Sequence, residues 1–292
     1  MTERLFVKIT RDLLPQAKDR FPFLYLERGR LEVDDSSVKW VDCSGEIIPI
    51  PVATISALLL GPGTSVTHDA VRTSTAANCA LAWVGEDALI FYAAGILTTS
   101  DTKGIKKQID LYANPQKRLE VARKMFSYRF PDADLAGKSL KEMMGMEGYR
   151  VRELYQEKAK EYQVGWKGRN FSPGSFEMSD ITNKNLTTLC AHLYGVVASV
   201  VHSMGLSPHI GFIHSGSPLP FVYDLADLYK AKFCVDVAFK VTKLTGGVYD
   251  KKIVSASFRK AAVEMDLMGN VVKDINNLIL EKSLGKTGGD SC

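Results

Sequence analysis

The sequence predicts an α+β protein of more than one domain, in which an N-terminal β-sandwich-like domain precedes a mostly α-helical domain. Residues 1–95 contain short apolar or alternating runs separated by turn residues, a pattern typical of strands. Residues 96–104 are rich in Thr, Ser and Gly and predict a linker. Apolar residues then recur with a helical period through residues 105–284, and the small, polar residues 285–292 predict a flexible tail.

The strands of the first domain are predicted at residues 23–27, 31–33, 38–41, 47–51, 55–60, 80–84 and 89–93. Their short, even spacing favours a small sandwich over a βαβ sheet. A single helix interrupts them: Thr67 can cap it, Asp69 lies in its first turn, and it extends to about Asn78.

The helices of the second domain are predicted at residues 105–112, 114–130, 140–162, 180–204, 218–230, 235–242 and 251–282. The helix at 180–204 is apolar on almost every side, which places it at the centre of the domain. Ser217 followed by Pro218 predicts a capped start for the helix at 218–230.

Composition sets limits on location. The chain is 46% hydrophobic and 24% charged, which is ordinary for a soluble globular protein. No apolar run reaches the roughly 18–20 residues that cross a bilayer, and the N-terminus lacks a secretory layout. We therefore expect a cytoplasmic protein without a membrane partner.

The cysteines predict no thiolate metal site. They are Cys43, Cys79, Cys190, Cys234 and Cys292, and no two form a CxxC pair. Their mostly apolar neighbours favour buried free thiols.

Basic residues are concentrated between residues 103 and 129. The net charge of +4 permits nucleic-acid binding without requiring it. The local run comprises Lys103, Lys106, Lys107, Lys117, Arg118, Arg123, Lys124 and Arg129. Such a run is usually a solvated helix face, and we expect part of it to face solvent.

Glu147 falls on the apolar stripe of the helix at 140–162. A carboxylate that points inward needs a partner, because burying an unpaired charge costs several kcal/mol. Arg150 or Arg152 could supply an ion pair at helical spacing, and a bound cation is the alternative.

A second acidic group lies in the segment of residues 211–230. Asp224 and Asp227 are three residues apart on one helix face, and His214 lies in the preceding turn. A divalent metal would balance these acids, and so would Lys230, three residues after Asp227.

Glu147, His214 and Asp227 together offer one imidazole and two carboxylates, a donor set suited to Mg²⁺ or Mn²⁺ more than to structural zinc. His192 and His202 lie on the central helix and are expected to be core residues. The chain contains no dinucleotide-binding, Walker, HExxH or GxSxG motif.

Several longer sequence motifs indicate a resemblance to a known protein family. They are residues 145–152 (GMEGYRVR), 162–169 (YQVGWKGR), 193–196 (LYGV) and 211–230, and in the first half residues 59–64, 83–86, 91–95 and 123–130. In these motifs the chain resembles CRISPR-associated protein one, the spacer-acquisition integrase and endonuclease, of subtype I-E.

The resemblance implies a helical catalytic domain and a homodimer that works with a dimer of CRISPR-associated protein two on double-stranded DNA, namely the captured fragment and the leader–repeat junction. It assigns Glu147, His214 and Asp227 as ligands of Mg²⁺ or Mn²⁺, and Asp224 as a further catalytic acid. Tyr194 and Lys230 match residues near the DNA. Arg169, Arg152 and Arg72 are candidate phosphate contacts. The chain departs from the family pattern at Ile90, Phe171, Phe176 and Ser217.

The implied reaction is attack by the 3′ hydroxyl of a captured fragment on a phosphodiester of the CRISPR array. Two alternatives stay open: a metal-dependent nuclease that cuts branched or single-stranded DNA without joining, and a DNA-binding scaffold without catalysis.

Overall fold

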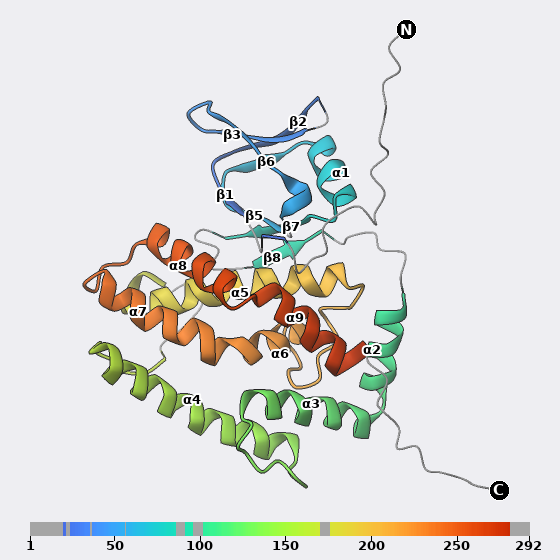
Figure 1. Cartoon of the computed structure of the whole chain (residues 1–292), viewed down its shortest axis with the longest axis vertical. Helices are drawn as coiled ribbons and strands as arrows, with labels where there is room; N and C mark the ends of the chain where they lie inside the picture. The colour runs from blue at the N-terminus through green and yellow to red at the C-terminus, as the bar shows by residue number, and fades with distance from the viewer. Residues whose placement is uncertain are drawn as a thin grey trace, which may run out of the picture.

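The computed structural model describes residues 20–280 except 22–23, 36, 56, 86–90, 96–101 and 170–175. Figure 1 shows the strands and the helix α1 (His68–Ala76) stacked above a larger helical region, which confirms the predicted fold class. The predicted tail and most of the predicted linker lie outside the described residues, as do Ile90 and Phe171.

Within the described residues, the N-terminal domain contains two four-stranded sheets. One has the order β1 (Leu24–Leu26), β5 (Ala57–Leu60), β7 (Ala80–Val84), β8 (Phe91–Ala94), and the other β4 (Ile47–Pro49), β3 (Ser37–Asp42), β2 (Gly29–Asp34), β6 (Thr64–Val66). Leu31, Trp40, Leu58 and Leu60 belong to the apolar core that the sheets share. This stacking is the sandwich that the strand spacing predicts.

The sheets are mixed, however, and include parallel pairs. β5 lies parallel to both β1 and β7, and the connection from β5 to β7 passes through α1 (His68–Ala76). Parallel neighbours need such a crossover, so the prediction of a sandwich in place of a βαβ arrangement is only partly right. Thr67 caps α1 by accepting a hydrogen bond from the amide of Ala70, as predicted.

Strand β5 joins the two domains. Leu58 and Leu60 point into the sandwich core, whereas Ala57 and Leu59 belong to the core of the helical domain. Because successive side chains of a strand point to opposite faces, a strand buried on both sides has an unbroken apolar sequence. The sheet of β5 is therefore the middle layer between the other sheet and the helices.

The helical domain is built around one central helix. Its helices are α2 (Lys103–Ala113), α3 (Pro115–Arg129), α4 (Leu140–Tyr162), α5 (Ile181–Ser203), α6 (Pro220–Tyr229), α7 (Asp236–Leu244), α8 (Lys251–Glu264) and α9 (Leu267–Ile275). Short π-helical segments follow α6 at Lys230–Val235 and α9 at Asn276–Leu280. α5 packs against α6, α7, α8, α9 and the sheet, which confirms the central position predicted for it. None of the helices in the described part of the chain has the length and apolarity needed to span a membrane.

Two predicted helix boundaries are wrong. α6 begins at Pro220 after an N-cap residue, Leu219, that makes no side-chain cap, so Ser217 does not cap this helix. The segment predicted as one helix at 251–282 breaks at Asp266, which adopts φ 47° and caps α9 by accepting a hydrogen bond from Gly269. An Asp that tolerates the left-handed conformation can restart a helix without a Gly or Pro.

We expect Gly195→Val to destabilise the protein, since a Cβ at this buried position of α5 would lie 3.0 Å from Leu59 of β5. Overpacking of this kind costs about 1–3 kcal/mol. The matched control is Gly145→Val in α4, where a Cβ meets nothing within 4 Å. Urea unfolding should show a lower free energy of unfolding for Gly195→Val and no decrease for Gly145→Val. Equal effects of the two would contradict the close packing of α5 on β5.

Candidate active site

The side chain of Asp224 holds the loop before α6 in place. Asp224 is 0% exposed, and its carboxylate accepts hydrogen bonds from the amides of Phe212 (2.5 Å), Ile213 (3.0 Å) and His214 (2.9 Å). Gly211 permits this approach, because a Cβ there would lie 2.7 Å from Pro220 and 3.0 Å from the Asp224 carboxylate. The three amides satisfy the buried charge of Asp224 and fix the loop on α6.

The same carboxylate orients the imidazole of His214. Nδ1 of His214 lies 2.7 Å from Oδ1 of Asp224, and Nε2 faces Oδ2 of Asp227 at 3.7 Å. A carboxylate accepts, so the proton belongs on Nδ1 and the lone pair of neutral His214 is on Nε2. The hydrogen bond to Asp224 raises the pKa of His214, and the negative charge of Asp227 adds to this effect against the opposing effect of burial.

Glu147 reaches the site from α4 and pairs with a residue other than the two partners predicted for it. Its carboxylate, 22% exposed, forms a salt bridge with Arg129 at the end of α3. The predicted partners are wrong: Arg150 pairs with Asp132 at 2.9 Å, and Arg152 lines the adjoining cavity. Arg129 also lies 4.0 Å from Oδ2 of Asp227.

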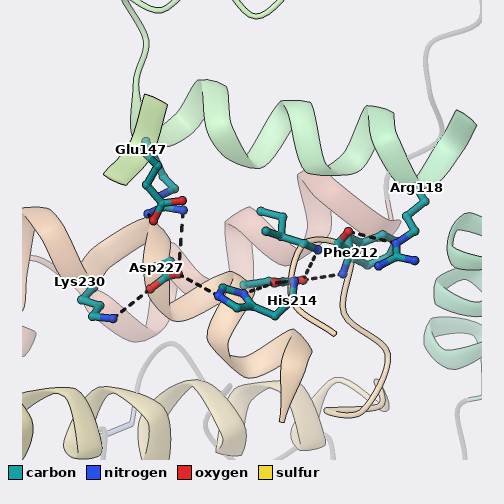
Figure 2. A network of polar contacts seen from close by, with 9 residues as sticks. Arg118, Glu147, Phe212, His214, Asp227 and Lys230 are labelled. Atoms are coloured by element: carbon teal, nitrogen blue, oxygen red, sulfur yellow. Dashed lines mark hydrogen bonds and ion pairs between the residues drawn. The ribbon is translucent and has the colours of Figure 1, made fainter. Parts of the chain in front are cut away.

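Figure 2 shows Glu147, Asp227, His214 and Lys230 gathered in one region where α4 faces α6. Nζ of Lys230 lies 3.5 Å from Oδ1 of Asp227, so the ion pair considered from sequence is present. Burial alone would lower the pKa of Lys230, but the charge of Asp227 raises it above its usual value. Among the described residues, no three His, Cys, Asp or Glu side chains form a ready metal-binding group as they lie.

A cavity of about 460 Å³ adjoins these side chains. It is lined by Arg129, Glu147, Val151, Arg152, Tyr155, Gln156, Trp166, Gly168, Arg169, Asp227, Lys230, Ala231 and Val235. Arg169 is held at its wall by Asn183 (2.8 Å) and Thr187 (3.0 Å). The cavity thus has two acids at one end and several cations around it, a distribution that suits a phosphate group.

Two predicted DNA contacts, Tyr194 and Arg72, do not line this cavity. The ring of Tyr194 packs edge-on against Tyr223, with the ring centres 5.0 Å apart. The ring centre of Tyr223 in turn lies 6.2 Å from that of His214. Arg72 pairs with Asp69 on α1, in the N-terminal domain at the top of Figure 1. The structure therefore does not bring Arg72 together with the other site residues.

The basic run at 103–129 is only partly a solvated face. Arg118 donates to the carbonyl of Phe212 (3.1 Å), Arg123 donates to that of Leu135 (3.2 Å), and the side chain of Arg129 is buried. A sequence signal for Arg129 existed, because it follows the core residues Met125 and Phe126 by four and three positions and so shares their helix face.

His192, His202 and three of the described cysteines are buried or partly buried, as predicted. His192 is buried, contacts the hydroxyl of Ser255 at 3.1 Å, and has its pKa lowered to about 3 by burial. Burial also lowers the pKa of His202. Cys79, Cys190 and Cys234 are buried thiols as predicted, whereas Cys43 is exposed.

Comparison with known proteins identifies the family. The endonuclease Cas1 2 of Chlorobaculum tepidum is 57% identical over 279 residues, which cover 96% of this chain and 94% of that protein. The chain belongs to the Cas1 family. The family model described as CRISPR associated protein Cas1 matches residues 128–246, the range that contains Arg129, Glu147 and the segment from His214 to Lys230. Escherichia coli Cas1 is 36% identical over 81% of this chain and 77% of its own length.

Solved structures agree with this membership. The protein in a TtCas1–DNA complex superposes with a TM-score of 0.80 at 35% identity, covering 91% of this chain and 95% of that one. A casposase bound to its integration product, only 15% identical, shares the fold with a TM-score of 0.68 over 89% of this chain and 91% of its own.

We expect Asp224→Asn to lower the free energy of unfolding by about 3 kcal/mol, because the amide cannot replace a charged acceptor of three buried amides. Asp250→Asn is the matched control. Asp250 accepts one amide hydrogen bond, from Ile253, as the exposed N-cap of α8, where Asn serves equally well. Urea denaturation should separate the two variants. A similar, small loss in both would show that Asp224 does not hold the loop.

Proposed function

We propose that this Cas1-family chain is a divalent-metal-dependent DNA endonuclease and integrase that inserts captured foreign DNA as new spacers into a CRISPR array. The observation that supports this most directly is that Glu147 and Asp227 line one cationic cavity and both face Arg129, with Nε2 of His214 3.7 Å from Asp227. The Chlorobaculum tepidum and Escherichia coli relatives are named endonucleases, and the TtCas1 structure holds DNA.

Glu147, His214 and Asp227 would hold Mg²⁺ or Mn²⁺. Two carboxylates and one imidazole are the donors that these cations accept, and the bond from Nδ1 to Asp224 leaves Nε2 of His214 directed at Asp227. When bound, the metal supplies Lewis-acid stabilisation of the charge that develops on the phosphate oxygens. Asp224 acts by fixing the imidazole and the loop, as a positioning acid.

The cationic residues of the cavity would bind the DNA backbone. Arg152, Arg169 and Lys230 line it, and a phosphodiester placed there lies beside the acidic end. The 3′ hydroxyl of the captured fragment attacks the phosphorus, the new P–O bond forms, and the bond to the 3′ oxygen of the leader–repeat junction breaks. The attacking hydroxyl loses a proton and the leaving oxygen gains one, so no further reactant is needed. Tyr194, whose ring packs against Tyr223 beside His214, would act as a positioning group and would form no covalent intermediate.

A homodimer and a dimer of CRISPR-associated protein two complete the proposed assembly. β4 forms an edge of its sheet, and its Ile47 and Ile48 are 59% and 41% exposed. Exposed apolar side chains on a sheet edge favour pairing with another chain, which fits dimerisation through the N-terminal domain. We assign subtype I-E on the motifs around Glu147 and at residues 211–230.

We expect joining of DNA to require Asp227. The assay combines the purified chain, the small partner protein, a labelled duplex with free 3′ ends, a supercoiled plasmid carrying a leader and repeat, and Mn²⁺ or Mg²⁺. Label should become covalently attached to relaxed plasmid, and Asp227→Asn should abolish this. Asp236→Asn is the control, because Asp236 pairs with Lys158 on α4 and is not among the residues lining the cavity.

The alternative outcomes separate the other functions. Nicked plasmid without joined label would identify a nuclease that uses water in place of the 3′ hydroxyl. Joining that persists in EDTA, or in Asp227→Asn, would contradict the proposed metal site. DNA binding with no reaction under either metal would indicate a scaffold.

A further inference from the structure

Arg129 is a buried cation that contacts two of the three proposed metal ligands. Its side chain is 5% exposed; Nη2 bonds to Glu147, and Nη1 lies 4.0 Å from Oδ2 of Asp227. That same oxygen of Asp227 faces Nε2 of His214 at 3.7 Å. The guanidinium therefore lies beside the position where one ion would meet Glu147, His214 and Asp227 together.

The bonding of Arg129 is incomplete on the side of Asp227. Among the described residues, Nε and Nη1 of Arg129 have no hydrogen-bond partner, although both are buried. The guanidinium carbon lies 5.5 Å and 5.4 Å from the ring centres of Phe126 and Phe130, which support the group without satisfying its N–H donors. A buried, partly unsatisfied cation is costly, and the two carboxylates are what stabilise it.

We infer that Arg129 is the resident counter-cation of the acidic pair Glu147 and Asp227. A divalent metal must compete with Arg129 for these two carboxylates. Arg129 thereby sets the metal concentration at which the site fills. This inference rests on the proposed metal site. Without metal, Arg129 offsets the repulsion between the two carboxylates. With metal bound, both carboxylates would interact with the ion, and their interaction with Arg129 would weaken.

Competition of this kind predicts tighter metal binding when the charge of Arg129 is removed. Binding of Mn²⁺ to the metal-free full-length chain would be measured by calorimetry and by the electron paramagnetic resonance signal of free Mn²⁺. We expect Arg129→Met to lower the dissociation constant about tenfold, because one unit of positive charge close to the ion is lost. Its melting temperature should fall in EDTA and rise more on addition of Mn²⁺ than that of the wild type.

Arg150→Met is the matched control. The guanidinium of Arg150 stacks on the same Phe130 ring at 5.3 Å but pairs with the exposed Asp132, and no interaction joins it to Glu147 or Asp227. Its Mn²⁺ affinity should equal that of the wild type. If Arg129→Met does not fold, Arg129→Lys is decisive, because a lysine keeps the charge but cannot reach both carboxylates with one ammonium. It should bind Mn²⁺ about threefold more tightly than the wild type.

The outcomes distinguish this inference from the proposed function. The inference alone is overturned if Arg129→Met binds Mn²⁺ no more tightly than the wild type; where only Arg129→Lys folds, the same holds for that variant. This conclusion requires that His214→Gln abolish the Mn²⁺ binding seen in the wild type, which shows that the metal site itself is present. Absence of His214-dependent Mn²⁺ binding in both the wild type and the Arg129 variants overturns the metal site itself. If Arg129→Met and Arg150→Met increase the affinity for Mn²⁺ equally, the effect comes from the loss of any nearby positive charge, and the inference is also overturned.

Discussion

The buried carboxylate of Asp224 is the constraint on which the site depends. It accepts three consecutive backbone amides and the Nδ1–H of His214, so one side chain fixes both the loop and the ring. A charge with 0% exposure is tolerated only with this many donors. Because Nδ1 is engaged, Nε2 is the atom that His214 presents to Asp227. The geometry of the site thus follows from where α6 places Asp224.

The charges of the site are balanced between side chains of different helices. α4 carries Glu147, α3 carries Arg129, and α6 with its π-helical extension carries Asp227 and Lys230. Each acid has a cation from another element or turn, which lets a cluster of carboxylates persist within a mostly apolar domain. α5 packs against α6 and its π-helical extension, and these pack in turn against α3 and α4, so the central helix of the domain supports the elements that carry the site.

The local sequence pattern is sufficient to predict much of this structure. The helical stripe placed Glu147 inward, the spacing of Asp224 and Asp227 placed them on one helix, and Lys230 was recognised as a partner at three residues' distance. Non-local partners were missed, because nothing in the spacing relates Arg129 to Glu147 across two helices or Asp224 to the amides of residues 212–214. The parallel pairing of β5 with β1 and β7 was missed for the same reason. The break at Asp266 was missed because it depends on a left-handed Asp, which sequence pattern does not distinguish from a helical one.

The most direct test of this account is the position of a bound ion. Crystals of the full chain soaked in Mn²⁺ should give an anomalous peak within about 2.0–2.3 Å of Nε2 of His214 and of carboxylate oxygens of Glu147 and Asp227, with Nδ1 of His214 still bonded to Asp224. A peak held by other residues would contradict the account. So would a His214 ring that binds the ion through Nδ1, because the orienting role of Asp224 would then be wrong.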